Sequence, residues 1–170
     1  MNLVFYISRL SENARTIESL VCNLSDEQAR WKISSDKWSI LQIVFHLQQT
    51  ESKDFRPRLE KTLRDPFEEW SPLLPEEMQL KQETAADDFK IFLQGFLQER
   101  ENSTGWLKTL DNPNFENTYP RQNLNLCAGD LHASWLAHDF LHIKQIIRAH
   151  FDYVNQISQP YTTDYAGSWT

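Results

Sequence analysis

Apolar residues recur every three or four positions along four stretches of the chain, which is the period of an amphipathic α-helix. The pattern predicts helices over about residues 2–22, 39–64, 84–110 and 128–156. A short additional turn of helix is expected at residues 25–31, with Ser25 or Asp26 as its cap. No strand pattern competes with these helices. Four long amphipathic helices favour an all-α protein, and specifically a four-helix bundle.

The second predicted helix carries two local signals. Ser39 is followed three residues later by Gln42, and this spacing predicts a capping box at the start of the helix. Pro57 lies inside the same pattern and is expected to kink the helix or to mark a local break, because proline has no N–H to donate to the preceding turn.

Two connections are unusually long, at residues 65–83 and 111–127. Both contain prolines and aromatic residues, and loops of this length generally cover a site or lack order. We interpret them as ordered lids or rims. Trp70 and Tyr119 lie within them and are candidates for the walls of a pocket.

Length and composition narrow the class of protein. The 170 residues form one domain, 1–170, which can bury a single core. The net charge of −7 disfavours partners such as nucleic acid and anionic membrane surfaces, which are bound through Lys and Arg. No apolar run approaches the roughly 20 residues of a membrane-spanning helix.

The cysteines and the first residues of the chain indicate where the protein resides. Cys22 and Cys127 are expected to be reduced and buried. Arg9, Glu12 and Arg15 come too early for the apolar segment of a signal peptide. We therefore expect a cytoplasmic protein.

The last predicted helix contains a pair of histidines. His138 and His142 are four residues apart, so their side chains stack on one face of the helix. Trp135, Leu141 and Gln145 share this face, which we expect to point toward the core. The spacing suits two ligands of one metal ion, but it suits two hydrogen-bonded core histidines as well.

The other histidines differ in their surroundings. His132 and His150 each lie about 120° around the helix from His138 and are interpreted as surface or interface residues. His46 lies in the apolar part of the second helix, where a lone histidine is usually a satisfied core residue. A bundle would bring the second and fourth helices together, and metal sites of bundles are built in that interior.

Three segments carry a resemblance to a known family. KWSILQIVFHLQQTE, LHASWLAHDFLHIKQIIRAH and the ending YAGSWT resemble signatures of the DinB-like (YfiT-type) superfamily. The resemblance implies a four-helix bundle with long crossover connections, in which three histidines hold a divalent metal. Carried over by position, the metal ligands would be His46, His138 and His142. Imidazole nitrogen suits several ions, of which zinc or nickel is expected here.

Three imidazoles leave coordination positions open, as in catalytic sites. Such an ion can activate either water or a thiolate. The resemblance therefore implies a metal-dependent enzyme acting on a small molecule, either a hydrolase or an S-transferase that uses a low-molecular-weight thiol. The alternative is a non-catalytic bundle for metal binding or dimerisation. The exposed faces of the bundle could support a homodimer.

Residues near the predicted ligands receive separate interpretations. Glu51 lies about 140° from His46, so we expect it to steady a neighbouring helix rather than to bind metal. Gln49 and Gln145 point nearer to the histidines and could orient ligands or water. Asp139 is expected to be a solvated charge. Four aromatic residues are expected to be core packing rather than a substrate cage: Trp31, Trp38, Phe45 and Trp135.

Overall fold

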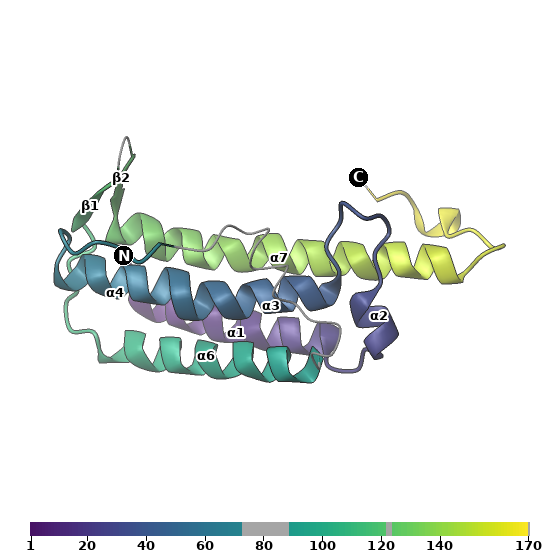
Figure 1. Ribbon diagram of the computed structural model, residues 1–170, viewed down its shortest axis with the longest axis horizontal. Helices are drawn as coiled ribbons and strands as arrows, with labels where there is room; N and C mark the ends of the chain where they lie inside the picture. The colour runs from purple at the N-terminus through teal and green to yellow at the C-terminus, as the bar shows by residue number, and fades with distance from the viewer. Residues whose placement is uncertain (73–88, 122–123, 170) are drawn as a thin grey trace.

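The computed structural model describes residues 1–72, 89–121 and 124–169 and shows an elongated helical bundle (Figure 1). Four rods lie side by side along its length. The rods are α1 (Leu3–Val21), the consecutive segments α3 (Ile40–Thr50), η1 (Glu51–Phe55) and α4 (Arg56–Arg64), then α6 (Phe89–Thr109) and α7 (Ala128–Ile157). The predicted four-helix bundle is confirmed, with helix ends within a few residues of the predicted ones. The predicted start of the third helix, residues 84–88, lies outside the described residues.

The second rod begins and bends where the sequence indicates. The Oγ atom of Ser39 accepts a hydrogen bond from the backbone of Gln42, and the Gln42 side chain bonds back to the Ser39 N–H, so the capping box is confirmed. The turn at Glu51–Phe55 is a π-helix rather than an α-helix. It ends at Phe55, two residues before Pro57, which has no N–H for the ladder, and this is the expected irregularity of the helix.

Two pairs of neighbouring rods run parallel. Phe45 of α3 packs against Phe92 of α6, and Glu51 of η1 pairs with Arg100, so residue numbers increase in the same direction on both rods. Arg64 and Phe89 consequently lie at opposite ends of the bundle, and the long connection between them joins parallel neighbours. Parallel neighbours require such crossovers, which a simple up-and-down bundle lacks.

The same holds for α1 and α7. Asn13 contacts Asp139 near the middle of the bundle, and the backbone of Leu20 contacts His150 further along. Each of these helices runs parallel to its partner although the rest of the chain separates them. The first and last helices therefore close the bundle.

Two short elements cap its ends. Helix α2 (Asp26–Arg30) starts at the predicted cap, Ser25, whose Oγ accepts a hydrogen bond from the Gln28 N–H. At the opposite end, β1 (Thr118–Arg121) and β2 (Leu124–Cys127) form an antiparallel hairpin. The hairpin lies within the predicted connection 111–127 and replaces none of the predicted helices. Strands of four residues are too short to show a clear alternation of polar and apolar positions.

The long loops are ordered where the structure describes them. Trp70 stacks on Tyr119 with ring centroids 4.0 Å apart and planes 11° apart. Neither ring lines the cavity described below, so the contact favours a structural role for these two residues over the predicted pocket wall. Residues 73–83 and 122–123 of the predicted loops lie outside the described residues.

A polar layer divides the core into two apolar clusters. One cluster contains Ile17, Leu47, Phe96 and Ile146, and the other contains Leu10, Phe55, Leu107 and Trp135. On each rod the residues between the two clusters are polar and buried. They include Asn13, Glu51, Arg100, Asp139 and His142. A layer of this kind is where a bundle can hold chemistry.

Two further sequence predictions concern the thiols and membranes. Cys22 is exposed and Cys127 is partly exposed, so their predicted burial was wrong, although both are free thiols. Cys127 is the cap of α7, where its Sγ accepts a hydrogen bond from the Asp130 N–H.

Among the helices that the structure describes, none combines the length and apolar character of a membrane span.

Candidate metal centre

Three histidines from two rods meet in the polar layer. His46 comes from α3, and His138 and His142 come from successive turns of α7. The Nε2 atom of His138 lies 3.2 Å from Nε2 of His46 and 2.9 Å from Nε2 of His142. The three side chains each present a nitrogen, and these nitrogens all lie within 4.8 Å of one another. The structure therefore brings together the three residues that the resemblance selected.

The spacing of these nitrogens fits a single metal ion. Two imidazole nitrogens bound to one tetrahedral zinc ion at roughly 2.0–2.1 Å are about 3.3 Å apart. The observed separations of 3.2 and 2.9 Å are close to that value. A set of three nitrogen donors also suits nickel and copper, so the donor set accepts a divalent ion without selecting which one.

Burial keeps the three imidazoles neutral, which is the form that binds metal. It lowers the pKa of His46 to about 4, and the neighbouring His142 lowers it further. Burial also lowers the pKa of His138 to about 3, with smaller contributions from His142, His46 and Arg100. The pKa of His142 falls for the same reason, although its hydrogen bond with Gln145 and the charge of Asp139 oppose the shift. At neutral pH each ring therefore offers a lone pair.

A glutamine orients one of the rings. The Oε1 atom of Gln145 lies 2.7 Å from Nδ1 of His142. An amide oxygen only accepts, so Nδ1 carries the hydrogen and the lone pair falls on Nε2, toward the other histidines. The prediction for Gln145 is supported by this contact. Gln49 instead accepts a hydrogen bond from Lys53 on its own rod, so no contact supports the same role for it.

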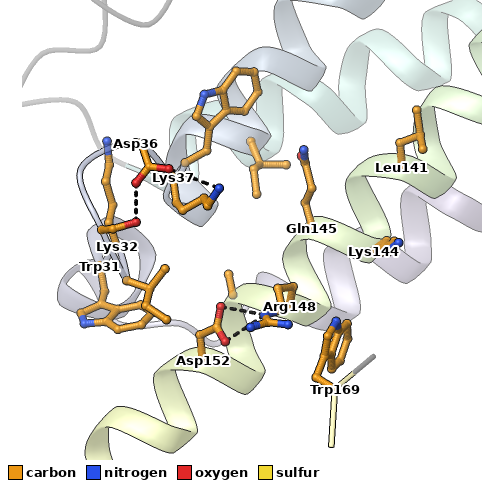
Figure 2. A pocket seen from close by; sticks show the side chains of 15 residues that line it. Trp31, Lys32, Asp36, Lys37, Leu141, Lys144, Gln145, Arg148, Asp152 and Trp169 are labelled. Atoms are coloured by element: carbon orange, nitrogen blue, oxygen red, sulfur yellow. Dashed lines mark hydrogen bonds and ion pairs between the residues drawn. The ribbon is translucent and has the colours of Figure 1, made fainter.

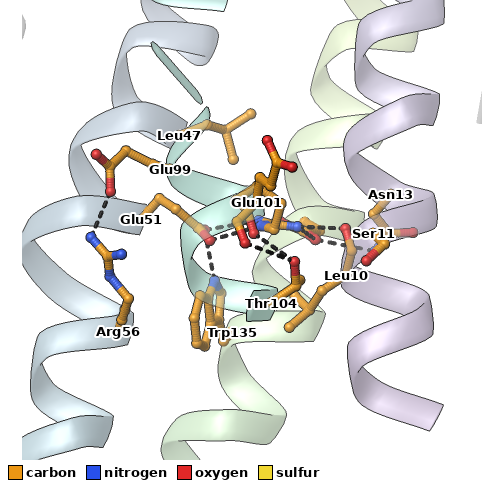
Figure 3. Close-up of polar contacts among 12 residues, drawn as sticks. Leu10, Ser11, Asn13, Leu47, Glu51, Arg56, Glu99, Glu101, Thr104 and Trp135 are labelled. Atoms are coloured by element: carbon orange, nitrogen blue, oxygen red, sulfur yellow. Dashed lines mark hydrogen bonds and ion pairs between the residues drawn. The ribbon is translucent and has the colours of Figure 1, made fainter. Parts of the chain in front are cut away.

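A buried ion cluster lies beside the histidines, because Asp139 directly follows His138 on α7. Figure 3 shows Asn13, Glu51 and Trp135, which contribute to this cluster. The guanidinium of Arg100 bonds to both oxygens of Glu51 at 2.8 and 3.0 Å and to both oxygens of Asp139 at 2.7 and 2.8 Å. Trp135 donates its indole N–H to Glu51, and Asn13 donates to Asp139. This Arg100 cluster joins all four rods.

The cluster corrects one prediction and confirms another. Asp139 was expected to be solvated but is fully buried, because Arg100 from another helix compensates its charge. Glu51 bonds to α6 and α7 rather than to the histidines, as its angle from His46 predicted. Burial alone would lower the pKa of the Arg100 guanidinium, but the charges of Glu51 and Asp139 raise it above its usual value. Arg100 therefore remains charged.

Sequence reasoning did not single out Arg100. One sequence feature could have indicated its burial. Arg100 lies four residues after Phe96, which is buried, so both side chains are on the same face of α6, and that face points into the core.

Aromatic side chains surround the histidines on two sides. The ring of Trp38 lies 5.1 Å from that of His46 and stacks on that of His142 at 6.3 Å. Phe55 lies 5.0 Å from His138. Trp38 was expected to be core packing alone, yet it also forms a wall of this site. Phe45 and Trp135 are buried as expected.

The two remaining histidines of α7 lie apart from the cluster. His132 is fully buried between the rings of Tyr6 and Phe115, so its predicted surface position was wrong. Its neighbours come from other helices and loops, which a helical angle cannot reveal. His150 is partly buried, and its Nε2 lies 2.9 Å from the carbonyl oxygen of Leu20.

The fold and the site together define a class of proteins. Its members are helical bundles with crossover connections, and they have a candidate metal centre formed by three histidines in the core. A family model, the DinB superfamily, matches residues 9–146, and the chain belongs to this superfamily. Its fold is similar to a solved structure described as "YfiT from Bacillus subtilis is a probable metal-dependent hydrolase with an unusual four-helix bundle topology". The two are 18% identical with a TM-score of 0.75, covering 89% of this chain and 87% of YfiT. A search among curated proteins finds no match.

Proposed function

We propose that this protein is a metal-dependent enzyme that acts on a small molecule, with His46, His138 and His142 as the metal ligands. The observation that carries this proposal is the convergence of three nitrogens within 4.8 Å of one another, on rings that burial keeps neutral. One of these imidazoles is buried and two are partly buried, and their grouped nitrogens present lone pairs to one another, an arrangement that a shared cation would stabilise. Zinc and nickel are the ions we expect.

The ion would supply Lewis acidity, and the protein would supply ligands, orientation and a water-poor surrounding. Three protein ligands leave at least one coordination position for water or substrate. Trp38 and Phe55 exclude bulk solvent from two sides of the cluster. Gln145 holds His142 in the tautomer that coordinates.

Two reaction types fit this arrangement, hydrolysis and transfer of a low-molecular-weight thiol. The description of YfiT as a probable metal-dependent hydrolase supports the first. The ion pairs of Glu51 and Asp139 with Arg100 support thiol transfer. These carboxylates lie near the histidines, but because they are paired they are not available as general bases for hydrolysis. Activation of a thiol as thiolate on a metal needs no such base. We favour thiol transfer slightly.

The metal is tested first. Purified protein should contain about one equivalent of divalent metal by elemental analysis, or should acquire it from added zinc or nickel. His142→Ala should lose this metal. His150→Ala is the matched control, because His150 lies on the same helix and contacts the Leu20 carbonyl instead of the cluster. Equal metal content in all three proteins would contradict the assignment of the ligands.

The reaction is tested next on the loaded protein. A panel of esters, amides and alkyl electrophiles is presented with and without a small thiol. Turnover that requires both metal and thiol identifies a transferase, and turnover that requires metal alone identifies a hydrolase. Stoichiometric metal without turnover of either type would favour the alternative, a non-catalytic metal-binding or dimerisation bundle.

A further inference from the structure

A cavity of about 880 Å³ opens next to the histidine cluster (Figure 2). One side is formed by the segment between α2 and α3, residues 31–38, and the other by α7 from Leu141 to Asp152. Trp169, near the end of the chain, folds back and completes the lining. The volume falls in the range of small-molecule pockets.

The cavity is lined by more positive than negative charge. Lys32, Lys37, Lys144 and Arg148 contribute four cations, whereas Asp36 and Asp152 contribute two carboxylates. This balance is opposite to that of the whole chain, whose net charge is −7.

Two of these cations form ion pairs with other described residues. Arg148 bonds to both oxygens of Asp152 at 2.9 Å, and Lys37 pairs with Asp36 at 3.2 Å. Within the described part of the chain, Lys32 and Lys144 form no ion pair. Lys32 and Lys144 lie on opposite sides of the opening (Figure 2), and their charges add to a positive potential around it.

The remaining walls are largely aromatic and aliphatic. Trp31 and Trp169 line the cavity, and the Trp169 ring packs over the Arg148 guanidinium with its centroid 5.5 Å from that group. Leu141 was expected in the core but is 62% exposed and lines this opening. A ligand that fits this lining has an apolar body as well as a charged end.

The cavity and the histidine cluster share two walls. Trp38 lines the cavity and stacks on His142. Gln145 also lines the cavity, and its Oε1 contacts Nδ1 of His142. The side chains of Trp38 and Gln145 would thus lie between a molecule in the cavity and the imidazole of His142.

We propose that this cavity is the substrate pocket and that it selects a molecule with an apolar body and an anionic group, carboxylate or phosphate, which Lys32 on one side of the opening or Lys144 on the other would bind. That the bound molecule is a substrate rests on the proposed function, which this assignment deepens. The binding preference itself depends only on the lining and does not require the metal.

The test compares two probes that differ in charge alone, 2-naphthoate and neutral 2-naphthamide. Their binding to metal-free protein is followed by NMR through the indole N–H signals of Trp31 and Trp169. We expect 2-naphthoate to bind about tenfold more tightly, because its carboxylate gains charge-assisted hydrogen bonds. The double variant Lys32→Gln, Lys144→Gln should abolish this preference. Lys108→Gln, on α6 at the other end of the bundle, is the matched control and should keep it.

A second variant separates the apolar wall from the charge. Trp169→Ala should weaken both probes by a similar factor, about fivefold, because an aromatic contact is lost without a change in charge. Equal affinities for the two probes in the wild-type protein would overturn the proposal, and so would an unchanged preference in the double lysine variant. Binding of 2-naphthoate only after zinc is added would also overturn it, since the anion would then be held by the metal.

Failure of this proposal can be distinguished from failure of the proposed function. Metal content is measured on the same samples. Protein that binds zinc but shows no preference for the anionic probe would refute the pocket alone. Protein that prefers the anionic probe but holds no metal would refute the enzyme and leave an anion-binding cavity.

Discussion

The Oε1 atom of Gln145 lies 2.7 Å from Nδ1 of His142, three residues earlier on α7. The bond determines which nitrogen of His142 carries the hydrogen, and so where its lone pair points. Gln145→Leu should therefore lower zinc affinity about tenfold while leaving the helical content unchanged. Competition with a chromogenic chelator measures the affinity. Gln156→Leu, at an exposed position of the same helix, is the control, and an equal loss in both variants would contradict the role of Gln145.

Metal should stabilise the fold if the ion joins α3 to α7. A ligand that binds only the native state, at a free concentration of 100 times its Kd, adds about 2.7 kcal/mol to the free energy of unfolding. Zinc added to chelator-treated protein should thus raise the Tm by several degrees, measured by circular dichroism. His150→Ala should show the same rise and His142→Ala should show little. A rise of the same size in His142→Ala would mean that zinc binds elsewhere.

Arg100 is predicted to be the most sensitive position of the polar layer. Arg100→Met would leave Glu51 and Asp139 buried without their cation, and breaking a buried ion pair from one side costs about 3–5 kcal/mol. Urea unfolding measures the change. Arg9→Met removes the half-exposed pair with Glu12 and should change the free energy of unfolding by less than about 1 kcal/mol. Similar values for the two variants would show that the Arg100 cluster contributes little.

His132 is predicted to weaken the fold in acid. Burial lowers its pKa to about 4, whereas in the unfolded chain the pKa is about 6.5. Below pH 6.5 His132 is protonated in the unfolded state but stays neutral in the folded state. The free energy of unfolding therefore falls as the pH drops from about 6.5 to about 4. Above pH 6.5 both states are neutral and the effect vanishes. Urea unfolding at a series of pH values measures this slope.

His132→Phe isolates that contribution. Neither ring nitrogen of His132 has a hydrogen-bond partner among the described residues, and its neighbours Tyr6 and Phe115 are aromatic. The variant should be more stable than wild type at pH 8, because an unsatisfied polar group is removed. Its advantage should grow by about 2 kcal/mol at pH 5. An advantage independent of pH would show that His132 does not titrate as described.

Much of the fold was predictable because it depends on the local periodicity of apolar residues. The positions of the four rods, the capping box of Ser39 and Gln42, and the irregularity near Pro57 follow from side chains within a few residues of each other. The three candidate ligands were predictable in a different way. The spacing of His138 and His142 places them on one face, but only the resemblance to the DinB superfamily joined His46 to them.

The tertiary structure alone decided what surrounds those residues. Helical angles alone predict a solvated Asp139 and a surface or interface position for His132, yet both are buried. Their burial depends on Arg100, Tyr6 and Phe115, which arrive from distant parts of the chain. Helical periodicity shows which way a side chain points around its own axis, but not what another helix places opposite it. The sequence by itself therefore determined the rods and the direction of their side chains, while packing decided which charges are compensated and where the cavity opens.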